Sequence, residues 1–517
     1  MSTTSIVGCQ RRVTPVSKGY RPRLMGCAAP LMMLFNAALA EDLRHGSVLS
    51  SAASRPSMAY AGSVSLQART LEVSLADAVY LGLHGNREIH RSYLQRLAHK
   101  FDLRVAEDGF SPRWIISSKH HAQQGSTGRS RDFTLSPKAT VSNEWGTTFS
   151  LSWAQRLNQA DRTGRNNERG MAFEVVQPLL RNAGRDIVTA PVRKARLSEE
   201  SRRLGLQANV ASTVSQIVVA YRELLKAQEQ QRIARDALAR AKDQLAVNDA
   251  LIAAGRMAAV ERLQTEANLA SQELGVEEAA HQLETQRRAL LHLLALDLAT
   301  PLRANEALTV ERVEMDHDEA MRIAMFRQPK YLQQRIAGEL VDIDLKVSKN
   351  QRLWDLSLVG GASQDRHAHS GQASRTAERR WNGYAGVQLE IPIGDLTQRQ
   401  QVLNAQVAVD THALQQQEDR QRLEREIGDA IRNMDTHWRR YEIAQRGRDM
   451  SKRTLEVERE KLKVGRSSNF QVLSFEEHMR LAENAVLGAL IACLNAQTAL
   501  DEHLGMTLDS WEIALND

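Results

Sequence analysis

Apolar and polar residues follow a helical period over most of this chain, and two of the helical runs are unusually long. The first extends from about Asp186 to Ala254 and contains one proline, Pro191, near its start, and one glycine, Gly205. A proline in the first turn costs no hydrogen bond, so the run predicts a helix on the order of 100 Å long at about 1.5 Å per residue. A seven-residue register predicts a left-handed supercoil against partner helices, with seam positions at Leu224, Gln231, Leu238, Leu245 and Ile252.

This helix is predicted to end in a tight reversal at Ala254-Gly255-Arg256, because glycine suits the left-handed residue that closes a helix. The same reversal recurs at Val464-Gly465-Arg466, after a second helical run that contains no proline beyond Pro392. In both places a leucine lies eight residues after the glycine and a glutamate eleven residues after it: Leu263 and Glu266, then Leu473 and Glu476. We infer an internal duplication in which each half reads helix, strand, strand, long helix, returning helix.

Four segments alternate apolar and polar residues with the period of a strand. In the first half the apolar positions are Phe149, Leu151 and Trp153, then Met171, Phe173 and Val175; in the second half they are Trp354, Leu356 and Leu358, then Val387, Leu389 and Ile391. One face is lipid-like and the other wet, as in a membrane barrel. A soluble sandwich has the same alternation, but the chain offers no partner core, and so few strands must be pooled among several chains to close a barrel.

Polar, basic stretches at 119–132 and 364–380 are interpreted as loops between these strands, and 135–141 as either an extra strand or a long loop. Their histidines, His120, His121, His367 and His369, lack a matching cysteine or carboxylate, so we interpret them as solvated rather than metal-binding. The chain contains no Gly-rich phosphate loop, metal-ligand spacing or nucleophile motif. We therefore predict no enzyme activity, no cofactor and no metal site.

The N-terminal forty residues have the three parts of a secretory signal peptide. Five basic residues and no acidic one precede or flank an apolar run from Leu24 to Phe35, and Ala38-Leu39-Ala40 is a small-residue cleavage site. Because this segment carries most of the formal net charge of +6, the charge gives no reason to expect nucleic-acid binding. Most of the apolar run follows Cys27, whereas in a lipoprotein signal the run comes before the cysteine. Cys493 is interpreted as a small apolar residue of a helix seam. Past the signal, we expect no run apolar enough for a membrane helix.

In its order and duplication, the sequence resembles the TolC-like outer membrane efflux proteins (outer membrane factors) over about residues 73–506. The matching stretches are Leu75-Ala76-Asp77-Ala78 through Asn86, Gln177-Pro178-Leu179-Leu180-Arg181-Asn182-Ala183-Gly184-Arg185, Ala254-Gly255-Arg256, Ile391-Pro392-Ile393 and Val464-Gly465-Arg466. The resemblance implies a homotrimer in the outer membrane of a Gram-negative bacterium. Four strands per chain would form a 12-stranded barrel, continued by a coiled-coil helical tunnel in the periplasm.

The resemblance also implies partners and sites. A periplasmic adaptor would dock on the two tips, Ala254, Gly255, Arg256, Val464, Gly465 and Arg466, and an inner-membrane transporter of RND or ABC type would supply the energy. The tunnel constriction would lie at Glu261, Gln471 and Ser474; the aspartates of well-known members, six and nine residues after the second glycine, are replaced here by Gln471 and Ser474. Outer-membrane lipid would contact Phe149, Leu151, Trp153, Phe173, Val175, Trp354, Leu356, Val387 and Leu389, with Trp354 in place of the usual proline.

The predicted division of the chain follows from these assignments. It comprises a signal peptide (1–40), a leader (41–72), a first repeat (73–296), an equatorial linker (297–318), a second repeat (319–506) and a tail (507–517). The predicted function is a passive channel subunit of a tripartite efflux or type I secretion system. The alternative is a secreted periplasmic coiled-coil scaffold without channel activity.

Overall fold

The structure is a computed structural model that describes residues 70–125, 128–160, 164–370 and 375–515. The predicted signal peptide and nearly all of the predicted leader lie outside the described residues. Order in the described part begins with β1 (Leu71–Val73), which pairs in parallel with β6 (Leu302–Ala304) in the predicted equatorial linker.

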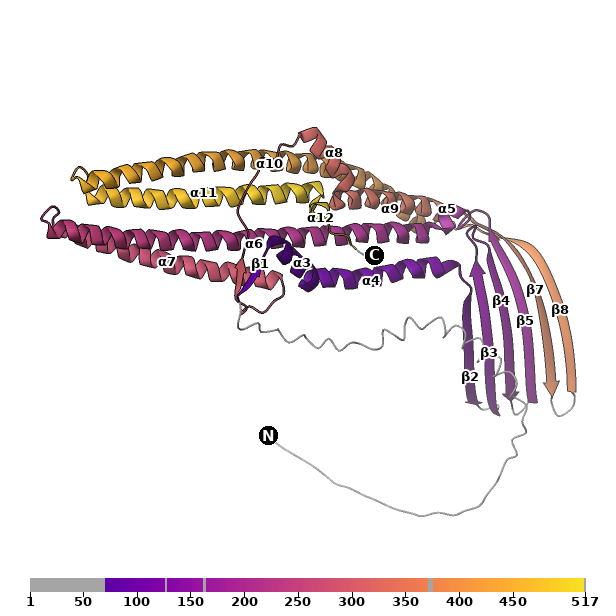
Figure 1. The fold of residues 1–517 in the computed structure, drawn as a ribbon. Helices are drawn as coiled ribbons and strands as arrows, with labels where there is room; N and C mark the ends of the chain where they lie inside the picture. The colour runs from indigo at the N-terminus through magenta and orange to yellow at the C-terminus, as the bar shows by residue number, and fades with distance from the viewer. Residues whose placement is uncertain (1–69, 126–127, 161–163, 371–374, 516–517) are drawn as a thin grey trace, which may run out of the picture. The chain divides into compact units, whose positions relative to one another are not determined.

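Helices make up most of the described chain (Figure 1). In the first half they are α3 (Leu75–Gly85), α4 (Arg87–Glu107), the 3-10 turn η1 (Asp108–Phe110), α5 (Arg185–Val188), α6 (Ala190–Ala253) and α7 (Val260–Leu293). In the second half they are α8 (His317–Arg327), α9 (Pro329–Gln351), α10 (Leu396–Lys463), α11 (Asn469–Leu504) and α12 (Thr507–Ser510). The same succession of short, medium, very long and returning helix thus occurs in both halves.

The two long helices have the predicted length, 64 residues in α6 and 68 in α10. The seam of α6 differs from the prediction in its lower part, where Ala237 and Gln244 are buried, as are Ala241 and Asn248. The predicted positions flank this seam and are half-buried: Gln231, Leu238, Leu245 and Ile252. Small side chains such as those of Ala237 and Ala241 let packed helices approach closely. The prediction followed large apolar residues and therefore selected positions beside the buried seam.

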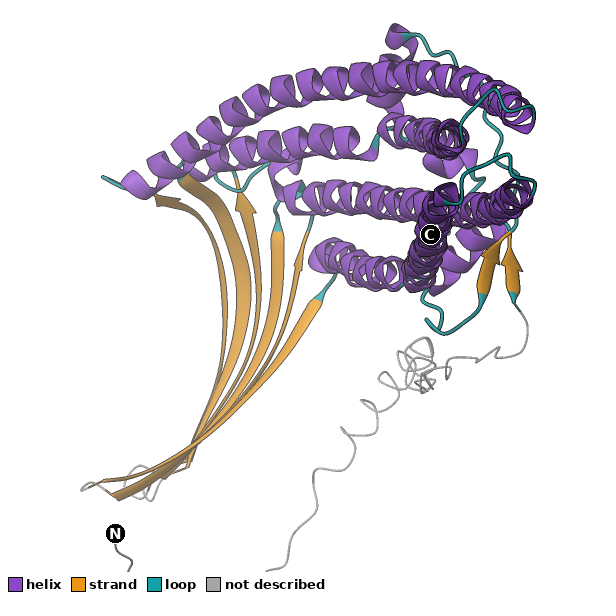
Figure 2. Cartoon of the chain, turned by 90° about the vertical axis from the view of Figure 1, so that its left-hand side faces the viewer, coloured by secondary structure: helices purple, strands orange, loops and turns teal. Residues whose placement is uncertain are grey.

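The remaining strands form one antiparallel sheet of six, in the order β2-β3-β4-β5-β7-β8, which Figure 2 shows as a strongly curved layer. The strands are β2 (Arg113–Gly125), β3 (Gly128–Ser142), β4 (Thr148–Ala160), β5 (Gly164–Pro178), β7 (Asp355–Ser370) and β8 (Arg375–Glu390). The two halves meet where β5 pairs with β7, for example Val176 with Val359. The sheet is therefore continuous across the chain.

Two of the predictions about this sheet were wrong. The polar stretches 119–132 and 364–380 are not loops, because most of their residues are paired in strands, as His120 is with Phe133. The chain also has six long strands instead of the four that the resemblance implies, since β2 and β3 are added and 135–141 lies within β3. Backbone pairing does not require apolar side chains, and hydrophobic alternation therefore misses the polar ends of long strands.

The helix α11 corrects a further prediction. It contains an 18-residue window with mean hydropathy 1.2 and is long enough to cross a membrane, although no such run was expected. The helix packs along α10 and α6, and Leu487, Leu490, Ile491 and Cys493 are buried. These contacts account for part of its apolar character, and a single helix of this kind is weak evidence for a membrane span.

The largest core cluster lies where the short pair β1-β6 crosses α6. Ile217, Tyr221 and Leu224 of α6 are fully buried there with Leu290 and Leu291 of α7. The Tyr221 hydroxyl donates to the Val73 carbonyl oxygen at 2.9 Å. Burial, followed by the charge of Glu306, raises the pKa of Tyr221 to about 12.

This shift predicts how stability depends on pH. Tyrosine in the unfolded chain ionises near pH 10, so the contribution of Tyr221 to the free energy of unfolding is present below about pH 10 and is lost as the pH rises through about 12. Tyr221→Phe should lower stability by about 0.5–1.5 kcal/mol at neutral pH, and the deficit should shrink above pH 10. Thermal unfolding followed by circular dichroism at a series of pH values measures both effects. Parallel profiles for the two proteins would contradict this assignment.

Candidate functional site

The two predicted tips have the same backbone geometry. Gly255 has φ +70° and Gly465 has φ +73°, a region that favours glycine. At the first tip the Gly255 N–H donates to the Ile252 carbonyl (2.9 Å) and the Arg256 N–H to the Leu251 carbonyl (2.8 Å). At the second, Gly465 and Arg466 donate to Leu462 (3.0 Å) and Lys461 (2.8 Å) in the same pattern. Each long helix therefore ends in a Schellman motif, which satisfies its last carbonyls.

Both tips are exposed. A Cβ built on either glycine meets no heavy atom within 4 Å in the described part of the chain. Arg256 and Arg466 are exposed as well, but they differ in their contacts, because the Arg256 guanidinium donates to the Lys463 carbonyl at 3.0 Å. One tip arginine thus ties the two hairpins together.

A buried polar network joins the hairpins immediately above the tips, and sequence reasoning missed it. The Asn248 amide donates to Thr265 Oγ1 and to Asn469 Oδ1, both at 2.8 Å, and Asn469 donates to Thr265 Oγ1 at 3.0 Å. All three side chains are at most 1% exposed. Because they come from α6, α7 and α11, the network fixes the register of one hairpin against the other. The sequence signal that could have indicated this network was an asparagine in the seam of a long helix.

A second, ionic layer lies farther from the tips. Arg240 of α6 pairs with Glu476 of α11 at 3.1 Å, and Arg459 of α10 contacts the same carboxylate. Glu266, the counterpart of Glu476 in the first half, forms only an exposed pair with Arg262 at 2.9 Å. Equivalent positions in the sequence therefore have different surroundings.

The predicted constriction residues lie near these layers but in different environments. Gln471 belongs to the capping box of α11, where Ser468 Oγ accepts from its backbone N–H and its own amide oxygen faces the Ser468 N–H at 3.3 Å. Ser474 is half-buried. Glu261, in the first turn of α7, has one buried carboxylate oxygen without a hydrogen-bond partner among the described residues. A role for the three residues in a constriction stays a prediction.

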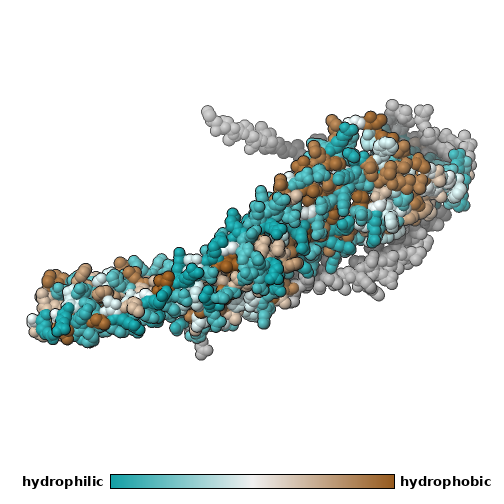
Figure 3. Space-filling model, turned by 90° about the horizontal axis from the view of Figure 1, so that it is seen from above, coloured by the Kyte–Doolittle hydropathy of each residue, from teal (hydrophilic) through white to brown (hydrophobic). Residues whose placement is uncertain are grey.

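The strand register places eight of the nine predicted lipid-facing residues on one face of the sheet, and the ninth, Trp354, lies just before the start of β7. Phe149 pairs with Val175, Leu151 with Phe173 and Leu356 with Leu389, and successive side chains of a strand point to opposite faces. Figure 3 shows hydrophobic residues gathered toward the end of the molecule that carries the sheet. The described aspartates and glutamates of the six strands lie on the other face: Asp132, Glu168, Glu174, Asp355, Asp365, Glu378 and Glu390.

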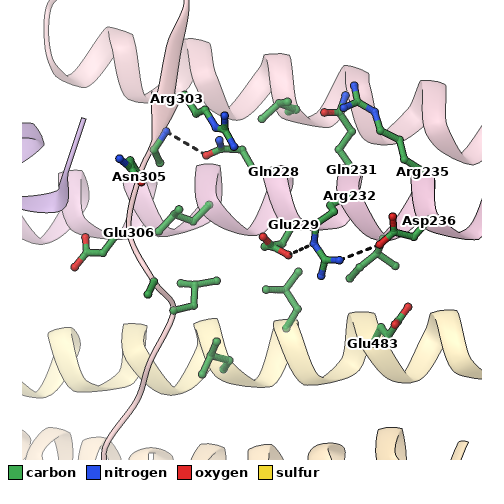
Figure 4. A pocket seen from close by; sticks show the side chains of 18 of the residues that line it. Gln228, Glu229, Gln231, Arg232, Arg235, Asp236, Arg303, Asn305, Glu306 and Glu483 are labelled. Atoms are coloured by element: carbon green, nitrogen blue, oxygen red, sulfur yellow. Dashed lines mark hydrogen bonds and ion pairs between the residues drawn. The ribbon is translucent and has the colours of Figure 1, made fainter. Parts of the chain in front are cut away.

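A groove lies where the segment that follows β6 crosses α6 (Figure 4). Several of its polar groups are paired with one another: Arg232 contacts Glu229 at 2.8 Å and Asp236 at 2.9 Å, and the Ala304 N–H donates to Gln228 at 3.2 Å. The Glu229 carboxylate raises the pKa of Arg232 above its usual value. The groove is therefore part of the packing of the equatorial segment and offers no evident ligand site.

No family model and no curated protein sequence matches this chain, whereas solved structures do. The Campylobacter jejuni outer membrane channel CmeC matches with TM-score 0.64 and 17% identity, over 84% of this chain and 86% of CmeC. The open state of the Neisseria gonorrhoeae outer membrane channel MtrE matches with TM-score 0.64 and 15% identity, over 84% and 89%. CusC, described for its transmembrane channel formation, gives 0.65 and 16%, over 84% and 94%.

The chain has the fold of TolC-family outer-membrane channels. The mainly helical channel fold that the sequence resemblance implies is therefore confirmed, with six long strands in place of four. Closure of a barrel, association of three copies and the division of the chain into two repeats stay predictions, as do the roles of the site residues.

The buried network above the tips makes a prediction about stability. Asn248→Ala removes both donors and leaves Thr265 and Asn469 without one buried partner, so it should lower the free energy of unfolding by about 1–3 kcal/mol. Arg256→Ala, which loses only an exposed contact, should change it by less than about 0.5 kcal/mol. Denaturant unfolding of the two variants tests this difference. Equal effects would show that the network does not hold the hairpins together.

Proposed function

We propose that this chain is an outer-membrane channel subunit of a tripartite efflux or type I secretion system in a Gram-negative bacterium. It is a passive conduit of the TolC family and catalyses no reaction, and its long helices lie in the periplasm. The observation that supports the proposal is a sheet with one apolar and one polar face, joined to long helices that end in two exposed tips. A periplasmic adaptor docks on these tips, and an inner-membrane transporter of RND or ABC type drives export.

Unpartnered apolar stripes on the helices support association of copies. On α4 a stripe with helical spacing is 54–70% exposed, formed by Leu94, Leu97, Phe101 and Val105. On α10 a second stripe is 53–72% exposed, formed by Leu396, Leu403, Val407 and Leu414. Apolar stripes of this length usually mark interfaces. A neighbouring copy of the chain would bury both of them.

The sheet edges support the same conclusion. β2 pairs only with β3 and β8 only with β7 in the described chain, and unpaired backbone groups are not tolerated in lipid. With six alternating antiparallel strands, β8 of one copy meets β2 of the next in antiparallel orientation. Three copies with six strands each would close a barrel of 18 strands, a size that leaves an aqueous channel. The acidic and hydroxyl side chains of the polar face would line it.

Fractionation and crosslinking test the proposal as a whole. The full-length protein, expressed with its native N-terminus, should fractionate with the outer membrane and migrate as a heat-sensitive trimer on unboiled gels. Val464→Cys places an exposed thiol at the second tip, whereas Cys493 is buried, so a crosslinker on this thiol should capture the adaptor. A soluble, monodisperse periplasmic protein without an adduct would instead support the scaffold alternative.

Docking at the tips predicts that side chains added there block export without unfolding the protein. Gly255→Asn and Gly465→Asn retain the left-handed backbone, which asparagine tolerates, and add bulk to an exposed surface. Export should fall at least about tenfold if each substitution costs 1.4 kcal/mol or more of docking free energy, while the trimer band is unchanged. Export can be followed as substrate accumulation or secreted product.

Gly394→Asn is the matched control for this experiment. Gly394 has φ +78° and open space around a built Cβ, but it lies before the start of α10 instead of at a tip. Export should therefore be normal in this variant. Normal export in the double tip variant as well would contradict docking at Gly255 and Gly465.

A further inference from the structure

Three arginines lie side by side on the apolar face of the sheet. Arg169 of β5 is paired with Arg366 of β7, which is paired with Arg379 of β8. All three side chains are exposed, and they make no hydrogen bond or ion pair with the residues that the structure describes. We call Arg169, Arg366 and Arg379 the arginine row.

The arginine row is electrostatically unfavourable within the chain itself. Like charges at directly paired positions destabilise a sheet, and the described carboxylates of the six strands all lie on the opposite face. Two arginines of that opposite face are neutralised, since Arg380 pairs with Glu378 at 2.8 Å and Arg156 with Glu168 at 3.7 Å. The arginine row therefore lacks the counter-charge that Arg156 and Arg380 have on the opposite face.

The arginine row borders the apolar band at its end away from the helices. The next paired positions toward the helices on the same face are Met171, Gln364 and Trp381, which is 70% exposed. Ten positions separate Leu389 from Arg379 along β8, which corresponds to roughly 34 Å along a strand and roughly 25 Å along the membrane normal at the usual tilt. This is about the height of the apolar band of a membrane barrel.

We propose that the arginine row binds the phosphates of lipid A, the phosphorylated glycolipid of the outer leaflet. This inference rests on the proposed function, because helices in the periplasm place the arginine row at the outer leaflet. Guanidinium groups donate paired N–H hydrogen bonds that match phosphate oxygens, and three of them span neighbouring strands. Trp381 and Met171 lie directly below, where acyl chains begin, which favours a lipid over a soluble anion. Arg131 and Arg165, on the same face and four residues farther along their strands than the row, extend the basic surface.

Binding of purified lipid A to the detergent-solubilised full-length protein tests the proposal. The probes are bisphosphorylated lipid A and the same lipid with both phosphates removed, and bound lipid is measured by native mass spectrometry over a titration. Wild-type protein should prefer the phosphorylated probe. The triple variant Arg169→Gln, Arg366→Gln, Arg379→Gln should bind it at least about tenfold more weakly, since charged hydrogen bonds contribute more than the 1.4 kcal/mol of a tenfold change.

Matched variants separate the arginine row from general charge effects. Arg156→Gln with Arg380→Gln removes basic residues from the other face and should leave lipid A binding unchanged. Replacing the arginine row with three lysines keeps the charge and should retain part of the affinity, which also controls for loss of fold. Equal binding of the two probes by wild-type protein, or equal affinity in the triple glutamine variant, would overturn the proposal.

Failure of the lipid A proposal can be told apart from failure of the proposed channel function. If the protein fractionates with the outer membrane but shows no preference for phosphate, the channel assignment stands and the lipid site does not. If the protein is soluble, the arginine row does not face a bilayer, and both proposals fail together.

Discussion

The backbone of the sheet sets the constraint on which the rest of this structure depends. In lipid, every N–H and C=O group needs a partner within the protein, and the six strands supply such partners everywhere except along β2 and β8. If the sheet lies in a membrane, as we propose, a single chain would therefore leave two strand edges unpaired. The exposed apolar stripes on α4 and α10 are consistent with this incompleteness, because a neighbouring copy would bury them in the proposed assembly.

At the other end of the helices, polar interactions act beside a small hydrophobic cluster that includes Leu462 and Val472. The buried Asn248 network and the Arg240–Glu476 layer link the two hairpins where small residues line the seam. Polar groups in a helix seam reduce stability compared with apolar residues but specify register. Such a joint has few alternative arrangements, and a gate built from it would change by breaking identifiable hydrogen bonds instead of by sliding.

The sequence was sufficient for the long helices, their glycine reversals and the apolar face of the sheet, because each of these has a strong local signal. Gly255 and Gly465 have the positive φ values expected for their motif, and the alternating residues such as Phe149 and Leu151 share one face. The sequence was not sufficient to predict the strand β3, the polar ends of the strands or the buried position of Asn248. Those features depend on which segments pair in space, and neither hydrophobic period nor composition carries that information.

The added strands also change the proportions of the proposed conduit. The diameter of a barrel grows roughly in line with its number of strands, so six strands per copy would make the exit about one and a half times as wide as four would. The long helices of each hairpin pair, α6 with α7 and α10 with α11, are not increased in number to match. Such a conduit would be wider at its barrel than in its helical part. Most of its electrical and hydrodynamic resistance would then lie in the helical part, and the barrel would add little resistance to a substrate that has entered at the tips.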